Sequence, residues 1–237
     1  MSDARPSYEP EALRALFDEM AQTYGAMNLV SSFGFAARWR HQIVAALPPT
    51  EPLRRVVDLM SGMGELWRSL SRRLGPDSQV IAVDLSSEMT RRAPKRTPFP
   101  VSVRTADVFE HDFGGDRYDA VVSSFGLKTL SPEQQEKLAL RVADLLRPGG
   151  TFAFVEISVP PSALLRQPYM FYVKTVIPRI GRVFLGNPAN YRQLGVYTEA
   201  FGNCVHFAAC LRRVGLEAVL TSYFFGCATG VVGRKPW

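Results

Sequence analysis

The stretch that decides the fold is RVVDLMSGMGEL, which runs from Arg55 to Leu66 of a 237-residue chain. A short apolar strand (55–59) leads into a turn that carries Gly62 and Gly64, and a helical pattern follows. Glycines at such a turn let a ligand approach the backbone closely, and the start of the helix supplies free N–H groups. The stretch therefore predicts a strand–turn–helix unit that holds a ligand.

On either side of this stretch, short apolar strands alternate with helical patterns. The alternation predicts right-handed crossovers and a mostly parallel α/β sheet, and two closing apolar runs predict an antiparallel hairpin at its edge. The expected strands are 55–59, 79–85, 100–105, 118–124, 150–158, 218–225 and 227–232, and the expected helices of this region are 65–74, 86–92, 132–146 and 203–214.

Two further regions do not follow the alternation. The first 50 residues have helical spacing, with helices expected at 13–20 and 36–47, whereas the region after residue 160 is rich in proline and aromatic residues. A chain of this length forms one large domain or two small ones. We expect a single domain over residues 1–237, with an N-terminal helical segment (1–50) and an inserted cap (160–200).

Composition narrows the class of protein. Apolar residues make up 46% of the chain and the net charge is +6, so a disordered chain is excluded. The uncharged run from Ala218 to Gly233 is shorter than the ~20 residues that span a bilayer, and residues 1–10 have no apolar signal core. Three cysteines without a CxxC pair indicate buried, reduced thiols. We therefore expect a cytoplasmic protein, and we expect no metal site because the three histidines lack metal-ligand spacing.

Acidic and polar residues follow the expected strands at the edge where open α/β sheets bind ligands. Asp84 ends the second strand, 26 residues after Asp58, and Asp107 and Ser124 follow the next two. A carboxylate at the place of Asp84 can bind both hydroxyls of a ribose. Trp67 stands where a dinucleotide turn has its third glycine, which disfavours NAD, and no GK[ST] sequence supports a P-loop. A sulfonium nucleoside fits these residues.

The sequence resembles the class I S-adenosylmethionine (SAM) methyltransferases, and within them the ubiquinone/menaquinone C-methyltransferase (UbiE-type) family. The resemblance implies a Rossmann-like fold with a seven-stranded, mostly parallel sheet, an antiparallel edge hairpin, N-terminal helices and a helical substrate cap. Five blocks carry it in the family's order: FDEMAQTYGAMNLVSSFGFAARWR (17–40), VVDLMSGMGEL (56–66), SFGLKTL (124–130), LLRPGGTFAFVEISVP (145–160) and YVKTVIPRIGRVFLGNPANYRQL (172–194).

The resemblance also implies a cofactor site. The amino-acid end of SAM would be held at the glycine turn, the ribose at the end of the second strand and the adenine after the third. Tyr24 and Ser32 would close over the cofactor, and Ser124 would lie beside the sulfonium. The remaining residues assigned to the site are Asp58, Met60, Ser61, Gly62, Gly64, Asp84, Leu85, Met89, Ala106, Asp107 and Val108.

On the acceptor side, the resemblance implies C-methylation of a lipophilic quinone ring, which requires a deprotonated ring hydroxyl. The family's Arg-Asn at its proposed proton-transfer centre is replaced here by Lys128 and Thr129. Tyr172 and Tyr191 of the cap are the other catalytic candidates. Neutral drift at Lys128 and Thr129 and a change in chemistry are both open interpretations. Met60, Met63 and Glu65 also depart from the family's SAM motif, and the methionines would change the shape around the sulfonium.

These departures motivate an alternative from the related rhodoquinone-biosynthesis enzymes. There, a ubiquinone methoxy group is replaced by an amino group, with SAM as nitrogen donor and Mn²⁺ as the metal. A second alternative is a non-catalytic SAM-fold partner in a quinone-synthesis complex. Nucleic acid is not expected as a partner, since no NPPY-type motif follows the fourth strand. The aromatic and arginine-rich cap favours peripheral contact with the inner membrane, and core or homodimer packing is the alternative interpretation.

Overall fold

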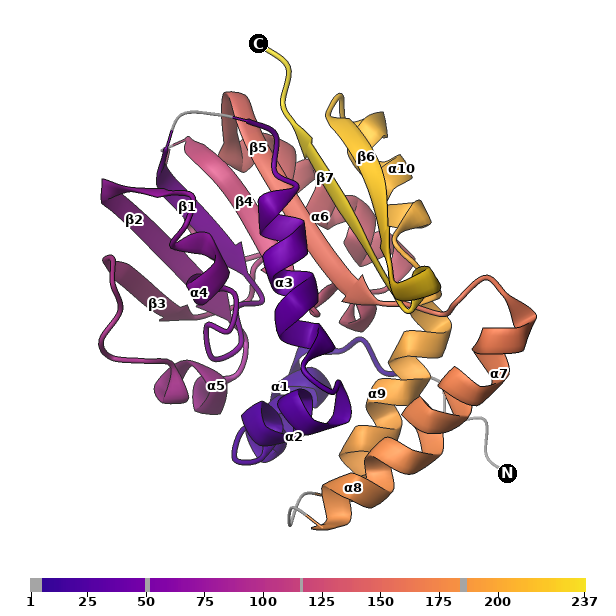
Figure 1. Cartoon of the computed structure of the whole chain (residues 1–237). Coiled ribbons are helices and arrows are strands. Elements are labelled where there is room, and N and C mark those ends of the chain that lie inside the picture. The colour runs from indigo at the N-terminus through magenta and orange to yellow at the C-terminus, as the bar shows by residue number, and fades with distance from the viewer. Residues whose placement is uncertain (1–5, 50–51, 116, 184–186) are drawn as a thin grey trace.

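The computed structural model describes residues 6–49, 52–115, 117–183 and 187–237, so residues 1–5 and 50 of the expected N-terminal segment lie outside it (Figure 1). Seven strands form one sheet in the order β3-β2-β1-β4-β5-β7-β6. The strands are β1 (Leu53–Leu59), β2 (Leu74–Asp84), β3 (Val101–Thr105), β4 (Tyr118–Ser124), β5 (Leu146–Ile157), β6 (Glu217–Tyr223) and β7 (Ala228–Arg234).

Strand directions confirm the expected class. The pairs from β3 to β5 are parallel, whereas β7 runs antiparallel to both β5 and β6 and forms the expected edge hairpin. The uncharged run from Ala218 to Gly233 lies in this hairpin. In the described part of the chain, no helix combines the length and the apolar character that crossing a membrane requires.

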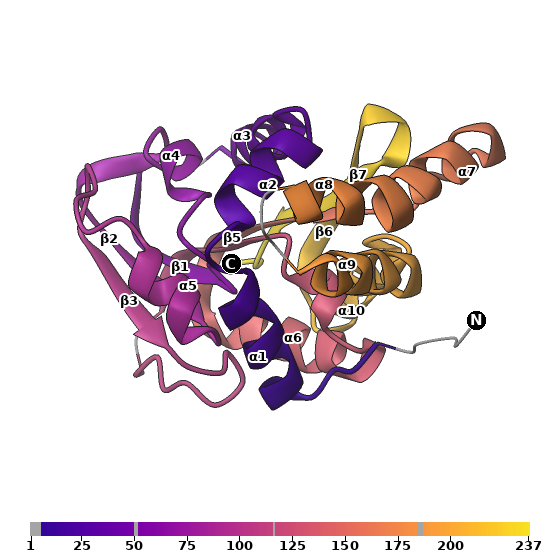
Figure 2. The ribbon, with the colours of Figure 1, turned by 90° about the horizontal axis from the view of Figure 1, so that it is seen from below.

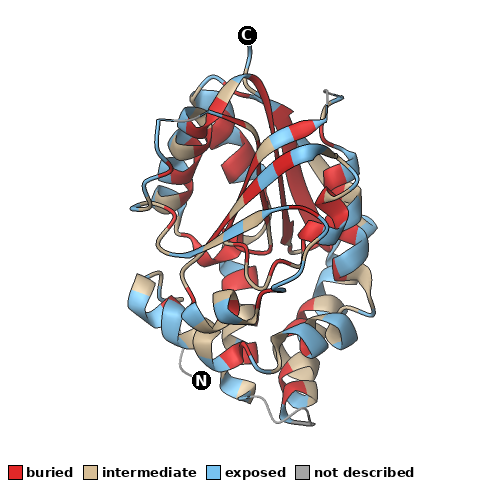
Figure 3. Ribbon diagram, turned by 90° about the vertical axis from the view of Figure 1, so that its left-hand side faces the viewer, coloured by how far each residue is buried: buried red, intermediate tan, exposed pale blue. Residues whose placement is uncertain are grey.

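Helices cover both faces of the sheet, and successive side chains of each strand point alternately to the two helix layers. Val56 faces α3 (Phe35–Ala45) and α4 (Trp67–Leu70), and its neighbour Val57 faces α6 (Pro132–Leu145) and α10 (Val205–Arg213). Both valines are fully buried, as are most residues of β4 and β5 (Figure 3). The helices that pack on the sheet are α3 (Phe35–Ala45), α4 (Trp67–Leu70), α5 (Ser87–Arg92), α6 (Pro132–Leu145) and α10 (Val205–Arg213).

One expected helix is wrong in extent. The pattern at 65–74 predicted about ten helical residues, but α4 has four and β2 already begins at Leu74. The turn before α4 stays irregular because Gly64 has a left-handed backbone (φ 84°) and Trp67 folds back beneath it. The helix is therefore confined between that turn and the early start of β2.

The remaining helices gather below the carboxyl ends of the strands. Figures 1 and 2 show α1 and α2 on one side of this end and the cap helices on the other. They are α1 (Pro10–Met20), α2 (Tyr24–Ser31), α7 (Ala163–Phe171), the π-helical turn η2 (Tyr172–Val176), α8 (Ile177–Val183) and α9 (Pro188–Phe201). These helices cover the carboxyl edge of the sheet, where the polar residues were expected to meet.

Candidate active site

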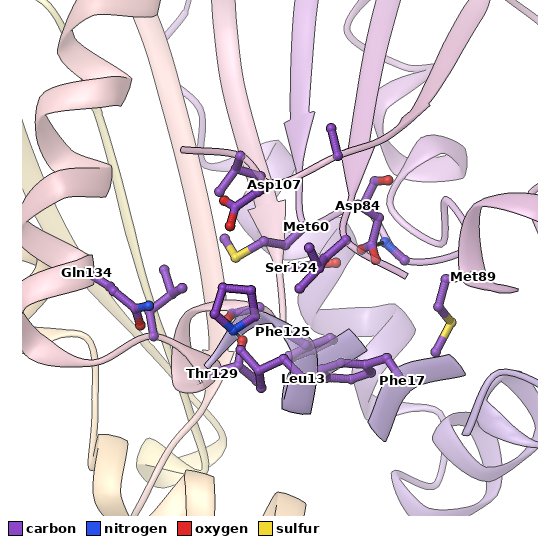
Figure 4. Close-up of a pocket in the computed structure, with 18 of the residues that line it drawn as sticks. Leu13, Phe17, Met60, Asp84, Met89, Asp107, Ser124, Phe125, Thr129 and Gln134 are labelled. Atoms are coloured by element: carbon purple, nitrogen blue, oxygen red, sulfur yellow. Dashed lines mark hydrogen bonds between the residues drawn. The ribbon is translucent and has the colours of Figure 1, made fainter. Parts of the chain in front are cut away.

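Two cavities lie side by side at the carboxyl edge of the sheet. The first, shown in Figure 4, is bounded by the ends of β1, β2 and β4 and by α1. The second lies between α2, the start of α3 and the cap, and has a volume of about 370 Å³. Tyr24 and Phe125 line both cavities. These two rings therefore form a wall that the cavities share.

The backbone is strained where β1 and β4 end. Met60 and Phe125 have left-handed conformations, with φ of 53° and 64°. Such conformations cost about 1–3 kcal/mol each and persist where the surroundings enforce them. Gly126 allows the two strand ends to approach, because a Cβ on it would lie 2.6 Å from the Met60 Cβ. The strain thus brings the Met60 side chain to the floor of the first cavity.

Asp84 is fixed by backbone donors at the end of β2. Its Oδ2 accepts the N–H of Gly62 at 2.7 Å, and its Oδ1 accepts the N–H of Ser86 at 2.9 Å. Burial, with the nearby charge of Glu65, raises the pKa of Asp84 to about 6 against the opposing effect of these hydrogen bonds. The carboxylate is thus held in the cavity at the place expected for ribose recognition.

Asp58 lies behind the glycine turn and does not line either cavity. Trp67 donates its indole N–H to Asp58 Oδ2 at 2.9 Å, and the indole fills the space that a side chain on Gly64 would need. Burial, together with the charges of Glu65 and Asp84, raises the pKa of Asp58 to about 8. Trp67 therefore occupies the third-glycine position as expected and also anchors the turn.

Three buried oxygens around the turn lack a hydrogen-bond partner among the residues that the structure describes: Asp58 Oδ1, Ser61 Oγ and Glu65 Oε1. Unsatisfied buried acceptors are costly, so they indicate a ligand with donors or positive charge. The ammonium of SAM has both. The sequence analysis noted Glu65 as a departure from the family motif but did not assign it to the site. Its position directly after the second glycine of the turn could have indicated that it belongs there.

The structure brings most of the expected cofactor residues together. Eleven line the first cavity: Tyr24, Met60, Ser61, Gly62, Asp84, Leu85, Met89, Ala106, Asp107, Val108 and Ser124. Ser32 instead lines the second cavity, while Gly64 lies beneath the turn with Asp58.

Arg40 was missed by the sequence reasoning. It is buried, donates to Ser124 Oγ at 3.2 Å and lies over the Phe125 ring at 4.7 Å. No short-range pattern distinguishes this arginine from the exposed Arg38 on the same helix. Leu13 and Phe17 of α1 were also not assigned to the cavity, although their helical spacing was recognised.

The second cavity is predominantly aromatic and aliphatic, and both expected tyrosines line it. Tyr172 donates its hydroxyl to the Ser31 carbonyl at 2.9 Å, and the Tyr191 hydroxyl lies 2.6 Å from Thr23 Oγ1. Burial raises the pKa of both tyrosines, so they are neutral at physiological pH. Their hydroxyls join the cap to the N-terminal helices.

A buried ion pair lies at the wall of the second cavity. Lys128 Nζ is 3.0 Å from Glu156 Oε1 and donates to the Phe125 carbonyl at 2.6 Å. Glu156 is fully buried at the end of β5 and also accepts the backbone N–H of Lys128 and of Ile157. Thr129 is turned away, lining the first cavity with its hydroxyl bonded to the Gly126 carbonyl.

Glu136, His206 and Cys210 form a cluster of potential metal ligands whose atoms lie within 4.8 Å of one another. None of the three lines either cavity. The Arg213 guanidinium donates to Glu136 at 2.8 Å and to the Cys210 sulfur at 3.2 Å. A cation of the protein itself therefore balances this cluster. The three cysteines are free and buried, as expected.

This strand order, with the first cavity over the ends of β1, β2 and β4, defines a class I SAM-dependent methyltransferase fold. Human N-acetylserotonin methyltransferase in complex with SAM matches with a TM-score of 0.61 at 16% identity, covering 98% of this chain and 63% of that one. A Haemonchus contortus phosphoethanolamine N-methyltransferase in complex with SAM gives 0.58 at 14%, covering 84% of this chain. This chain spans about half, 53%, of the latter's length.

Sequence comparison identifies the family. The model of the ubiE/COQ5 methyltransferase family matches residues 6–235. The demethylmenaquinone methyltransferase of Thermus thermophilus is 30% identical over 224 residues, covering 93% of this chain and all of the relative. The ubiquinone/menaquinone biosynthesis C-methyltransferase UbiE of Geobacter sulfurreducens is 30% identical over 232 residues, covering 95% and 89%. The chain belongs to the ubiE/COQ5 methyltransferase family, and SAM is its cofactor.

The raised carboxyl pKa values predict that SAM binding depends on pH. Asp58 and Asp84, with pKa values of about 8 and about 6, lose protons when a cationic ligand binds beside them. We expect affinity for SAM to rise with pH from about 6 to about 8 and binding to release protons. Calorimetry in two buffers that differ in ionisation enthalpy measures that release.

The matched variants are Asp58→Asn and Asp77→Asn. The first removes the group that titrates near pH 8 and should abolish the proton release there. The second makes the same chemical change at an exposed aspartate and should behave as the wild type. Unchanged proton release in Asp58→Asn would contradict the assignment.

Proposed function

We propose that this protein transfers a group from SAM to the ring of a lipophilic quinone or quinol, with C-methylation as the default reaction. The observation that carries the proposal is a large apolar cavity that shares Tyr24 and Phe125 with the cofactor cavity and holds the Lys128 ammonium at its wall. The names of the relatives from Thermus thermophilus and Geobacter sulfurreducens support a quinone as the acceptor.

The second cavity suits a planar ring on an apolar tail. Its walls include Trp39, Phe33 and Phe35 from the N-terminal part and Tyr169 and Tyr172 from the cap. Aromatic walls favour stacking of a flat ring, and aliphatic residues farther into the cap favour a hydrocarbon chain. We therefore propose that the 160–200 segment is the acceptor cap.

Lys128 supplies the charge that the ring oxygen needs. An ammonium has three N–H donors, and the described residues provide two acceptors for it, Glu156 and the Phe125 carbonyl. The third N–H remains for a ring oxygen in the cavity. An ammonium held in a low-dielectric site stabilises the phenolate of a quinol, which makes a neighbouring ring carbon nucleophilic.

The other residues position the reaction and keep water out. SAM, when bound, supplies a methyl group on a sulfonium whose leaving group is a neutral thioether. Tyr24 and Phe125 separate that site from the acceptor and limit the approach to one direction. Glu156 acts through Lys128, whose ammonium it holds in place.

This assignment predicts a selective loss of turnover in Lys128→Met. We expect kcat on a short-tailed quinol to fall by about 10²–10³-fold, because a donor to the developing oxyanion is lost. SAM affinity should be unchanged, since Lys128 does not line the cofactor cavity. Steady-state kinetics and calorimetry measure the two quantities.

Lys174→Met is the matched control, because it removes a half-exposed lysine of the cap that pairs with Glu199. It should retain wild-type turnover. In Glu156→Gln the ammonium loses its counter-ion, so we expect a changed pH profile of kcat with a smaller loss of rate. Full activity of Lys128→Met would refute the role of this ion pair.

The relatives named above are methyltransferases, and the amination alternative rests on Glu65 alone. Glu65 Oε1 is buried and lacks a partner among the described residues, and Glu65 lines the cofactor cavity. An amino group must lose its proton before its nitrogen attacks a ring carbon, and a buried carboxylate beside it can accept that proton. Mn²⁺ is expected only if this alternative holds. Among the described residues, the group of potential metal ligands is Glu136, His206 and Cys210, which line neither cavity.

The product separates the two reactions. Short-tailed demethylated quinol and short-tailed ubiquinone are each incubated with SAM, with and without Mn²⁺, and the products are weighed by mass spectrometry. We expect a methylated ring from the first; an amino group in place of methoxy in the second would establish amination instead. SAM binding without turnover of either acceptor would favour the non-catalytic partner.

Glu65→Gln adds a test of the same choice. The variant keeps the size of the side chain but removes the proton acceptor. If the reaction is methyl transfer, we expect weaker SAM binding with kcat nearly unchanged. A loss of kcat at saturating SAM would instead support a proton-accepting role for Glu65, as amination requires.

A lipophilic acceptor also determines where the enzyme works. Quinones with long tails reside in the bilayer, so we propose that the protein makes peripheral contact with the cytoplasmic face of the inner membrane. A homodimer stays the alternative explanation for its exposed apolar side chains.

A further inference from the structure

Large exposed apolar side chains are concentrated around the second cavity. Twelve such residues occur in the described part of the chain, and seven belong to α2 and the turn after it, to α7, or to the turn between β6 and β7. We call these seven the apolar rim. They are Leu29, Val30, Phe33, Leu164, Phe171, Phe224 and Phe225.

Ring contacts connect the rim to the cavity. Phe33 stacks on Tyr172 at 6.0 Å between centroids, and Phe224 lies 4.6 Å from Phe35 and 5.6 Å from Phe225. Phe33, Phe35, Tyr172 and Phe224 also line the second cavity. Figure 2 shows the elements that carry these residues, α2, α3, the β6–β7 turn and α7, along one side of the molecule. The rim therefore continues the apolar wall of the cavity onto the surface.

Two turns of the rim hold phenylalanines outward against local backbone preference. Phe33, Phe224 and Phe225 have left-handed φ values of 50°, 44° and 56°. This conformation is rare for bulky residues and costs conformational free energy at each of them. Phe33 and Phe225 are nevertheless 77% and 78% exposed. Burial within the monomer does not repay that cost, so the strain points to an external contact.

Helix α7 presents a third apolar surface. Leu164, Pro168 and Phe171 recur at i, i+4 and i+7 and are all exposed, with Leu164 at 89%. This spacing places them on one face of the helix. The opposite side supplies Tyr169 to the cavity wall and Met170 to the interior. The helix is therefore apolar toward the protein and toward the outside.

The segments around the rim carry positive charge only. Residues 21–50, 157–198 and 218–237 contain no aspartate or glutamate. Exposed Arg38 lies one turn after Phe35, and exposed Arg166 donates to the carbonyls of Pro160 and Pro161, next to Gly226 of the β6–β7 turn. Apolar side chains bordered by arginines match an anionic lipid surface.

We propose that the apolar rim inserts into the surface of a bilayer that contains anionic lipid, with the mouth of the second cavity facing the membrane. An acceptor can then pass from the hydrocarbon into the cavity without crossing water. A second copy of the chain on this surface would cover the mouth and set arginines against arginines. The inference deepens the proposed function and rests on it for its purpose, but its test does not depend on turnover.

The test is co-sedimentation of the full chain with vesicles of phosphatidylcholine alone and of phosphatidylcholine with phosphatidylglycerol. We expect binding to the anionic vesicles that weakens with salt, and little binding to the neutral ones. The double variant Leu164→Glu/Phe225→Glu should bind at least about tenfold more weakly, because two apolar side chains are replaced by charges. Neither residue lines a cavity.

The matched control is Leu140→Glu/Val205→Glu, which also replaces two exposed apolar side chains with glutamate, here on α6 and α10 and away from the rim. It should bind vesicles as the wild type does. Circular dichroism and melting temperature show that both variants fold. Equal vesicle binding by the two double variants, or no binding by the wild type, overturns the proposal. So does a wild-type dimer in lipid-free solution that the rim variant alone dissociates.

Measurements of turnover distinguish a failure of this inference from a failure of the proposed function. If both hold, the rim variant keeps its activity on a short-tailed acceptor in solution and loses it on an acceptor embedded in vesicles. Vesicle binding by a wild type that turns over no quinone would refute the acceptor and leave the docking surface standing.

Discussion

The position of β1 in the sheet is the constraint on which the site depends. β1 pairs with β2 on one side and β4 on the other, and the helices that follow β1 and β4 cover opposite faces. The chain therefore diverges at the carboxyl ends of β1 and β4 and leaves a crevice there. The left-handed turns at Met60 and Phe125, and the close contact at Gly126, shape the floor of that crevice.

The two cavities are electrostatic opposites. Glu65 and Asp84 line the first with acidic oxygens, and Asp58 lies behind its glycine turn, which suits a ligand that carries positive charge. The second is predominantly apolar, and Lys128 of a buried ion pair lies at its wall. The ion pair is neutral as a whole, so it can orient an oxygen without burying a net charge. The difference in charge therefore favours a cationic ligand in the first cavity and an apolar ligand in the second.

Local sequence patterns predicted the strands of the α/β unit and their mostly parallel direction, the glycine turn and Asp84, because each depends on residues near one another in the chain. The patterns did not predict Arg40 or Glu156 as site residues. Arg40 donates a hydrogen bond to Ser124, which is 84 positions away in the chain. Glu156 lies in a strand of buried residues, and no local pattern marks it as a site residue. Thr129 follows Lys128 in sequence, but the 3-10 turn at 127–129 directs the two side chains to different cavities. The short α4 likewise follows from the packing of Trp67 on Gly64, which no periodicity contains.

The shared wall of Tyr24 and Phe125 has a consequence for selectivity. In the proposed reaction the two ligands meet at this wall, so the few residues next to it would recognise the ring, and the far end of the cavity would contact the substituent that the ring carries. A longer or shorter hydrocarbon chain then changes how far the molecule extends toward the surface without moving the ring. The enzyme would be strict about the head of its acceptor and tolerant of its tail, which suits a cell whose quinone pool differs in chain length.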